Sequence, residues 1–217
     1  RSGTSGRRDS NTYNSIGREG AIAGSCQSCS SGTKGFLGSF DCLSNAEHQE
    51  DSERSILEKL YLEMNGDNWL DNTKWMDPDE TICSWFGIQC VSEDQESVKT
   101  IVLENNRLRN RLTTEIYQLP NLQELNVAGN DIEFSFDGMD NAKSLDYLDI
   151  EEVCLQSLSG VEKASSLQLL RVDGNALTTF PQEVFQLPNL EVLSLSDNAF
   201  PEQEMPAQIQ NFANLVY

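Results

Sequence analysis

Residues 167–177 read LQLLRVDGNAL, and residues 190–200 show the same arrangement as LEVLSLSDNAF. Both segments fit the pattern L-x-x-L-x-L-x-x-N-x-L, and so do three earlier segments that begin at Val98, Leu122 and Leu145. The five starts, at positions 98, 122, 145, 167 and 190, are separated by 24, 23, 22 and 23 residues. A near-constant period of this length predicts a solenoid in which each repeat contributes one structural unit.

Each repeat is expected to form a short strand whose apolar side chains are buried only by stacking on the neighbouring repeats. The asparagine at the turn can bond backbone groups inside the solenoid and continue as a ladder from repeat to repeat. In the third repeat Val153 stands where this asparagine is expected, and Leu215 fits the start of a sixth repeat. The pattern therefore predicts an α/β solenoid with a curved parallel sheet.

The segment before the repeats predicts a helix and a tryptophan-rich loop. Ser52 precedes apolar residues at helical spacing, and residues 65–67 (Asn-Gly-Asp) form a sequence that ends helices. We expect Trp69, Trp75 and Trp85 to cover the exposed apolar end of the first repeat. A carbohydrate-binding platform is the alternative interpretation of the three tryptophans.

These segments resemble the leucine-rich-repeat superfamily, and the part before the repeats is similar to its plant-type N-terminal cap. The cap resemblance rests on residues 65–69 (NGDNW), 72–75 (NTKW) and 83–90 (CSWFGIQC). It implies a disulfide between Cys83 and Cys90, and a role in recognition like that of receptor ectodomains and secreted inhibitor proteins. The convex segments differ from the plant pattern: residues 112–116 and 205–209 lack its glycine, and residues 155–166 resemble the shorter bacterial or intracellular type.

The chain accordingly divides into a flexible Gly/Ser-rich tail over 1–50, a cap over 51–97 and leucine-rich repeats over 98–217. The tail has few large apolar side chains, so burial cannot offset its backbone entropy. Because the chain starts at Arg1, we expect a processed or partial product from which any targeting segment would already be missing. The repeats show no C-terminal cap, which predicts a continuation beyond Tyr217.

The remaining cysteines have no assigned chemistry. Cys26 and Cys29 form a C-x-x-C without a second pair, and the pairing of these two with Cys42 stays open. Cys154 lies beside the expected asparagine position, and we expect it to be a small buried apolar residue.

The formal net charge of -20 is concentrated in the folded part. Residues 1–50 hold five of the 15 basic and five of the 35 acidic side chains, which leaves 10 and 30 for residues 51–217. Such a field disfavours nucleic acid and anionic lipid, and it attracts basic proteins. Solubility alone is the alternative reason for the acidity. The chain contains no apolar run long enough for direct membrane insertion.

Alternate side chains of a strand point to opposite faces, so the x positions around the second and third leucines form one surface, which we call the concave face. One row across the repeats consists of Val102, Asn126, Asp149, Arg171 and Ser194. The other candidate binding residues are Glu104, Asp146, Tyr147, Glu151, Glu152 and Asp173, with Glu124, Glu191 and Asp197 nearby. Tyr147 and Arg171 are candidate anchors for a basic partner. A solvated acidic surface is the alternative.

We expect neither a metal nor a cofactor, and no enzymatic activity. The carboxylates of the third repeat could attract Ca²⁺, but rigid strands space them poorly around one ion. The single histidine, His48, lies in the predicted tail, and an open sheet offers no cleft in which to tune a catalytic group.

The leading hypothesis is therefore a non-catalytic module that binds a protein or peptide on its acidic concave face. The alternative is a structural subunit of a large assembly, held by its N-terminal tail and the flank of the solenoid. The disulfide implied by the resemblance indicates an extracellular, cell-surface or oxidising organelle location. No asparagine lies in an N-x-Ser/Thr sequon, so glycosylation adds no support for that location.

Overall fold

The computed structural model describes residues 52–92, 95–201 and 206–207. The predicted tail over 1–50, with its three cysteines and its histidine, lies outside the described residues. So does the predicted sixth repeat at Leu215. Among the described residues, no helix is both long enough and apolar enough to span a membrane.

The described chain begins with helix α1 (Glu53–Glu63), as the apolar spacing predicts. The Ser52 side chain caps it by accepting a hydrogen bond from the Ser55 N–H at 3.3 Å, which satisfies one of the free donors of the first turn. The helix ends at Met64, and Asn65 then adopts the left-handed conformation with φ 61°. Its apolar face is buried against the cap and the first repeat through Ile56, Leu57, Leu60 and Tyr61.

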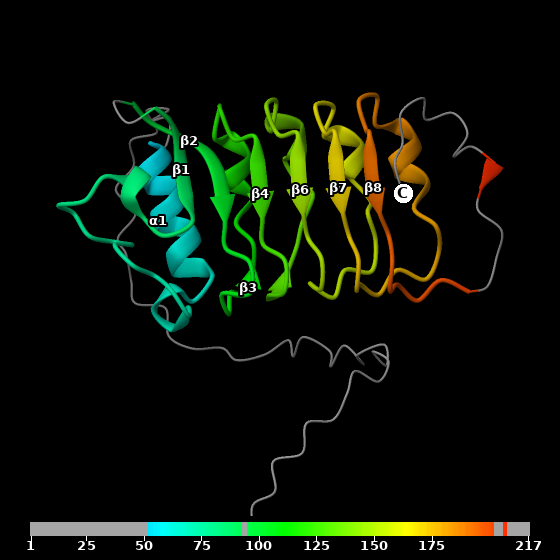
Figure 1. Cartoon of the computed structure of the whole chain (residues 1–217), viewed down its shortest axis with the longest axis horizontal. Coiled ribbons are helices and arrows are strands. Elements are labelled where there is room, and N and C mark those ends of the chain that lie inside the picture. Colours follow the sequence, from blue (N-terminus) through cyan, green and yellow to red (C-terminus); the bar gives the residue numbers. More distant parts are fainter. Residues whose placement is uncertain (1–51, 93–94, 202–205, 208–217) are drawn as a thin grey trace, which may run out of the picture.

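The main sheet has six strands in the order β1-β2-β4-β6-β7-β8 (Figure 1). Their bounds are β1 (Ile88–Ser92), β2 (Gln95–Val102), β4 (Glu124–Asn126), β6 (Tyr147–Asp149), β7 (Leu169–Arg171) and β8 (Val192–Ser194). The strands from β2 to β8 pair in parallel, one from each repeat, whereas β1 runs antiparallel to β2. The solenoid predicted from the five-fold repeat is thus the observed fold. A second parallel pair, β3 (Arg109–Arg111) and β5 (Asp131–Glu133), forms at the turns.

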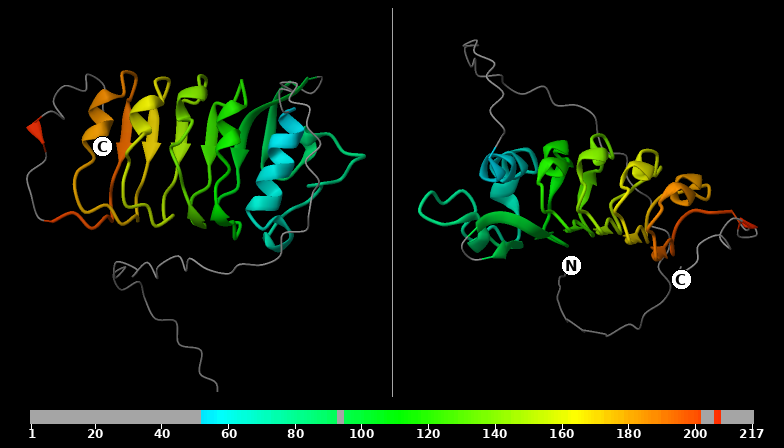
Figure 2. Two further views of the ribbon diagram at one scale, coloured as in Figure 1. Left: turned by 180° about the vertical axis from the view of Figure 1, so that it is seen from behind. Right: turned by 90° about the horizontal axis from the view of Figure 1, so that it is seen from above.

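Short 3-10 helices lie on the side of the molecule opposite the sheet (Figure 2). In the repeats they are η3 (Thr114–Gln118), η4 (Met139–Asn141), η5 (Val161–Lys163) and η6 (Gln182–Gln186), while η1 (Gly66–Asn68) and η2 (Ile82–Ser84) belong to the cap. The apolar core lies between the two layers. Leu125, Leu148 and Leu170 are in register on successive strands and fully buried, and each such side chain contributes roughly 1.5–3 kcal/mol.

Buried asparagines connect the turns of successive repeats. Asn175 Oδ1 accepts the backbone N–H groups of Val153 and Leu155 at 3.2 and 2.8 Å, and its Nδ2 donates to the Ile150 carbonyl at 2.8 Å. Asn130 bonds the first repeat in the same way. The predicted ladder is therefore present, but it is interrupted at Val153, which has no side-chain amide.

The three tryptophans pack in the core of the cap and do not form an exposed platform. Trp69, Trp75 and Trp85 are 6%, 6% and 1% exposed. Neighbouring ring centroids lie 5.0 Å apart between Trp69 and Trp75, and 4.8 Å apart between Trp75 and Trp85. The Trp69 indole N–H donates to the Met64 carbonyl at 2.9 Å, which ties the loop to the end of α1.

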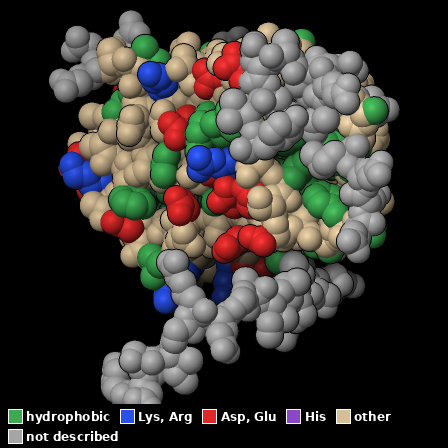
Figure 3. All heavy atoms as spheres, turned by 45° about the vertical axis from the view of Figure 1, so that its right-hand side comes forward, with side chains coloured by type: hydrophobic (Ala, Val, Ile, Leu, Met, Phe, Trp, Pro, Cys, Tyr) green, Lys and Arg blue, Asp and Glu red, His purple; other side chains and the backbone are tan. Residues whose placement is uncertain are grey.

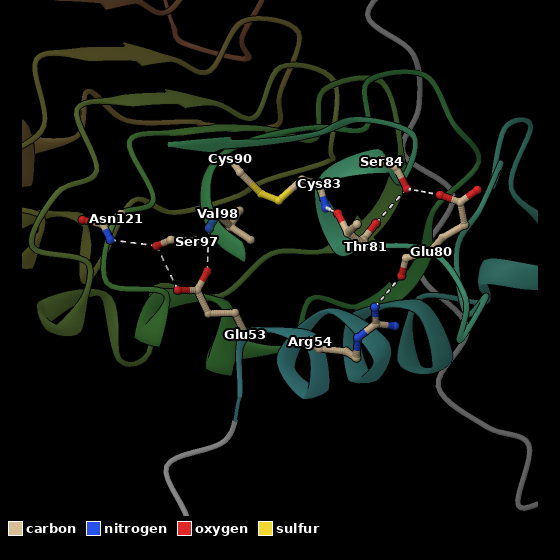
Figure 4. Close-up of a disulfide and its surroundings, with 10 residues drawn as sticks. All are labelled: Glu53, Arg54, Glu80, Thr81, Cys83, Ser84, Cys90, Ser97, Val98 and Asn121. Atoms are coloured by element: carbon tan, nitrogen blue, oxygen red, sulfur yellow. Dashed lines mark hydrogen bonds between the residues drawn. A yellow bond between two sulfur atoms is a disulfide. The ribbon is translucent and has the colours of Figure 1, made fainter. Parts of the chain in front are cut away.

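The structure contains the Cys83–Cys90 disulfide implied by the resemblance, with Cα atoms 5.4 Å apart (Figure 4). It joins η2 to β1. Beside it, the Glu53 carboxylate accepts hydrogen bonds from the Val98 N–H at 2.5 Å and the Ser97 hydroxyl at 3.1 Å. The cap is thereby linked to the first repeat both through its tryptophan core and through polar contacts.

Candidate functional site

The predicted row across the concave face is continuous in the structure. Strand register pairs each member with the next, in the order Val102, Asn126, Asp149, Arg171 and Ser194. Because the strands are adjacent and parallel, these side chains lie side by side across the sheet. The repeat register read from the sequence is correct at each of these strands.

Tyr147, Asp149 and Arg171 form a contact group in the middle of the row, which we call the central group. The Tyr147 hydroxyl donates to Asp149 Oδ2 at 3.4 Å, and Arg171 Nη1 lies 3.7 Å from the same oxygen. The Arg171 guanidinium carbon lies 6.0 Å from the centroid of the Tyr147 ring, at the limit of cation–π range. The Asp149 side chain is 4% exposed and that of Arg171 is 44% exposed, so a buried carboxylate positions an arginine at the surface.

Two further carboxyl groups lie where the strands turn. Asp173 Oδ1 accepts hydrogen bonds from the Ser194 hydroxyl at 2.7 Å and from the Ser196 N–H, which fixes it against the next repeat. The Glu151 carboxyl group interacts with that of Asp173, with which it can form a hydrogen bond. Because an ionised carboxylate can only accept, such a bond requires a proton on one of the two groups.

Burial and charge shift the acids of this face toward the protonated form. Burial is the main cause that raises the pKa of Glu151 to about 7, followed by its hydrogen bond with Asp173 and repulsion from Asp149 and Asp173, against the attraction of Arg171. Burial also raises the pKa of Asp149, although the Glu151 N–H and Arg171 oppose the rise. The charge of the concave face therefore changes close to neutral pH.

The sequence predicts Asn126 and Asp149 as contact residues, and the structure corrects their role. They are 8% and 3% exposed. Asn126 Oδ1 accepts the Ala128 N–H at 3.0 Å, and Asp149 Oδ1 accepts the Glu151 N–H at 3.2 Å. Both side chains turn back to bond their own loops, so they support the surface and present little of it. Strand alternation predicts on which face of the sheet a side chain lies, but not how far that side chain is exposed to solvent.

Asp146 and Glu152 lie apart from the central group. Asp146 is half-buried just before β6, at the opposite end of that strand from Glu151, and its carbonyl accepts the Gln168 and Leu169 N–H groups. Glu152 is exposed in the turn with φ 51°. Neither residue takes part in the hydrogen bonds that join Asp149 to its neighbours.

The other predicted residues frame the face. Val102 and Ser194 are half-buried at the two ends of the row, and Glu104 is exposed beyond β2, where it accepts the Asn126 amide at 3.5 Å. In the space-filling view, acidic side chains gather around a basic one in the middle of the visible face (Figure 3).

Sequence reasoning missed an apolar row beside the central group. Register pairs Tyr147 with Leu169, and Leu169 with Val192, and all three are half-buried on the face that carries Tyr147. The signal was present, since these residues occupy the x position just before the second leucine of each repeat. The prediction selected mainly charged residues of the concave face and left out Leu169 and Val192.

Within residues 52–92, 95–201 and 206–207, no three His, Cys, Asp or Glu side chains are grouped so as to hold a metal ion. Cys154 differs from expectation. It is half-buried with φ 59°, whereas Val153 beside it is 2% exposed and fills the interior position. The turn therefore directs the valine inward and leaves the cysteine partly at the surface.

Comparison with known proteins agrees with this architecture. A family model described as "Leucine Rich repeat" matches residues 118–133, which include β4 and the buried Asn130 of the ladder. The chain has the leucine-rich-repeat fold. The repeats, the parallel sheet and the asparagine ladder are the parts of the structure on which this assignment rests.

The chain is 32% identical over 126 residues to the disease resistance protein UNI of Arabidopsis thaliana. This match covers 54% of the chain but only 14% of UNI, so the chain spans a small part of that relative.

Two solved structures show the same fold. A plant ice-binding protein has a TM-score of 0.60 and 21% identity, over 74% of this chain and 52% of that one. The BIR3–SERK2 complex of Arabidopsis thaliana has a TM-score of 0.57 and 20% identity, over 71% and 88%.

Proposed function

We propose that this leucine-rich-repeat chain is a non-catalytic recognition module whose concave face binds a protein or peptide with basic side chains. The observation that carries the proposal is the central group, in which buried Asp149 holds Arg171 and Tyr147 at the surface beside Glu151 and Asp173. Tyrosine and arginine are enriched among the residues that dominate binding energy. Carboxylates around them attract a cationic partner and orient it.

The surroundings of the central group favour a polypeptide ligand. Half-buried Leu169 and Val192 continue the row of Tyr147 and supply apolar contact area. Leu169 lies on β7, whose backbone is bonded to β6 and β8, and Val192 lies on β8, whose backbone is bonded to β7. Because the backbone is already fixed, little conformational entropy is lost on binding. The similar fold in the BIR3–SERK2 complex supports a macromolecular partner.

We also propose that the chain works by binding and not by catalysis, in an extracellular, cell-surface or oxidising organelle location. On the described concave face the Ser194 hydroxyl donates to the Asp173 carboxylate, but no described residue there is a histidine that could act as its base. The Cys83–Cys90 disulfide supports an oxidising compartment. Alkylation of the native protein followed by mass spectrometry tests the latter, because thiols at both cysteines would contradict it.

The binding proposal is tested by probing the full chain with peptide arrays of equal length and apolar content whose net charge is positive, zero or negative. We expect positive peptides to bind best. Replacement of Glu151 by Lys should weaken their binding about tenfold, since a close charge pair is worth at least about 1.4 kcal/mol. Glu183→Lys changes the net charge equally but lies on η6, opposite the sheet, and should leave binding unchanged.

Three outcomes contradict binding on the concave face. Equal weakening by both substitutions would mean that only the net charge matters. No preference for positive peptides would remove the electrostatic argument. Binding that is lost when residues 1–50 are deleted, but is insensitive to Glu151→Lys and Tyr147→Ala, would favour the alternative of an assembly subunit held by its tail.

A further inference from the structure

A pocket of about 400 Å³ is lined by residues of the cap and of the first repeat. The segments that supply them, at the C-terminal end of α1 and at β3, lie at the same edge of the solenoid (Figure 1). This pocket, which we call the cap-edge pocket, is lined by Asn65, Asn68, Arg107 and Arg109. The lining contains no acidic side chain, although residues 51–217 hold 30 acids against 10 bases.

The backbone directs both arginines into solvent on the same side. Leu108 between them is fully buried and its N–H donates to Asn130 Oδ1 at 2.9 Å, whereas Arg107 and Arg109 on either side of it are exposed. The Arg109 N–H donates to the Met64 carbonyl at 3.3 Å, which fixes β3 against the end of α1. The position of the arginines is thus set by backbone bonds and does not depend on their own side chains.

The two asparagines line the same pocket and are held by the end of α1. Asn65 adopts φ 61° at the end of α1, and Asn68 Nδ2 donates to Asn65 Oδ1 at 2.8 Å. Because each side-chain amide carries two N–H donors, this bond leaves the Asn65 amide and one N–H of Asn68 available to a ligand.

Among the described residues, the guanidinium groups of Arg107 and Arg109 have no acidic partner, as is also true of Lys99, Lys143 and Lys163. Ion pairs with carboxylates occupy Arg54, Lys59, Lys74, Arg111 and Arg171. Within the part of the chain that the structure describes, no ion pair or side-chain hydrogen bond involves Arg107 or Arg109. The end of α1 attracts cations, which explains a positive charge here but supplies no acceptor for ten guanidinium N–H groups.

We propose that the cap-edge pocket binds a tetrahedral oxyanion, the sulfate or phosphate group of a monoester. Two adjacent guanidinium groups match such a group because each can donate two parallel N–H bonds to its oxygens. The asparagine amides add neutral donors to the same pocket. The pocket volume lies within the range of small-molecule sites and exceeds what the anion alone needs, so part of the esterified carrier enters as well. This site is separate from the concave face and does not depend on its function.

The test is an NMR titration of the full chain with phenyl sulfate, phenyl phosphate and uncharged benzamide. The readouts are the side-chain amide signals of Asn65 and Asn68 and the Nε–H signals of the arginines. We expect saturable shifts with the two esters and none with benzamide. The double substitution R107Q/R109Q should raise the dissociation constant at least tenfold, whereas R107K/R109K, which keeps the charge without the planar fork, should have a smaller effect.

The matched control is K143Q/K163Q, which removes the same charge from two exposed lysines on the η4 and η5 side. It should change the dissociation constant less than twofold. Unchanged melting temperatures would show that every variant is folded. Tighter binding of one ester identifies the natural group as sulfate or phosphate, and equal binding assigns the site to the tetrahedral anion itself. Shifts that do not saturate, or an equal loss in both double variants, would overturn the proposal.

Discussion

The Val153 backbone N–H donates to Asn175 Oδ1 at 3.2 Å, although Val153 itself stands where the neighbouring repeats carry asparagine. The third repeat is therefore held by the amide of the fourth but offers none to the second. Between the second and third repeats, backbone bonds remain, such as that from the Val127 N–H to the Asp149 carbonyl at 3.1 Å. Cohesion at that junction relies more on apolar packing than it does further along the chain.

Replacing Asn175 by Ala should lower the free energy of unfolding by about 2–4 kcal/mol, because it leaves several buried backbone groups without partners. Urea denaturation measures the change. Asn189→Ala is the matched control, since exposed Asn189 makes one bond, to the Ser165 carbonyl. Its effect should stay within about 0.5 kcal/mol. Similar losses of unfolding free energy in the two variants would show that the buried asparagine ladder stabilises the chain no more than one exposed hydrogen bond does.

Glu151 should make the chain less stable as the pH rises toward 8. Its folded pKa of about 7 lies above the ordinary 4.5, so the folded state binds the proton more tightly. The stability from this proton is complete below pH 4.5 and is lost as the pH rises through 7. Glu151→Gln stays neutral and should flatten the decline in melting temperature between pH 5 and 8, while Asp149, Asp173 and Arg171 remain in place.

The control for this pH dependence is Glu152→Gln, which alters the exposed neighbour of Glu151. Its melting temperature should follow that of the unmodified chain across the same pH range. If Glu151→Gln also ran parallel to the unmodified chain, the raised pKa of Glu151 would be refuted.

Glu115 should titrate at unusually low pH because Lys59 and Thr113 both donate to its carboxylate, which lowers its pKa to about 2. Lys59→Met should move that pKa upward toward 4.5, and Thr113→Val should move it less. The side-chain carboxyl ¹³C signal reports the titration. In the unmodified chain the stability from ionised Glu115 is present above pH 4.5 and lost as the pH falls through 2. An unmoved midpoint in both variants would assign the shift to another cause.

Removing the disulfide with C83S/C90S should cost roughly 2–3 kcal/mol of unfolding free energy, the value expected for a closed loop this short. Denaturant titration with and without reductant separates this bond from other thiol effects. The unmodified chain should drop to the level of the double variant when reduced, and the variant should not change. A stable, fully reduced chain would mean that the tryptophan core alone maintains the cap.

The repeat was readable from sequence because its apolar spacing repeats five times, so that errors at one position, such as Val153, do not alter the register. The cap helix was readable from Ser52 and the helix-ending residues after Met64. The burial of Asp149 could not be predicted from the sequence, because it depends on the turn in which the Glu151 N–H donates to the Asp149 carboxylate. The cap-edge pocket was also invisible, because Asn65 and Arg109 approach only when β3 docks on α1.

The antiparallel pairing of β1 with β2 gives the molecule a polarity. Another repeat inserted before β8 would find a parallel neighbour on each side and would simply lengthen the scaffold by one unit. On the other side of β2, the reversed β1 offers an edge that an added parallel repeat does not match. The solenoid can therefore be lengthened by inserting repeats on the C-terminal side of β2, whereas the cap fixes its N-terminal end.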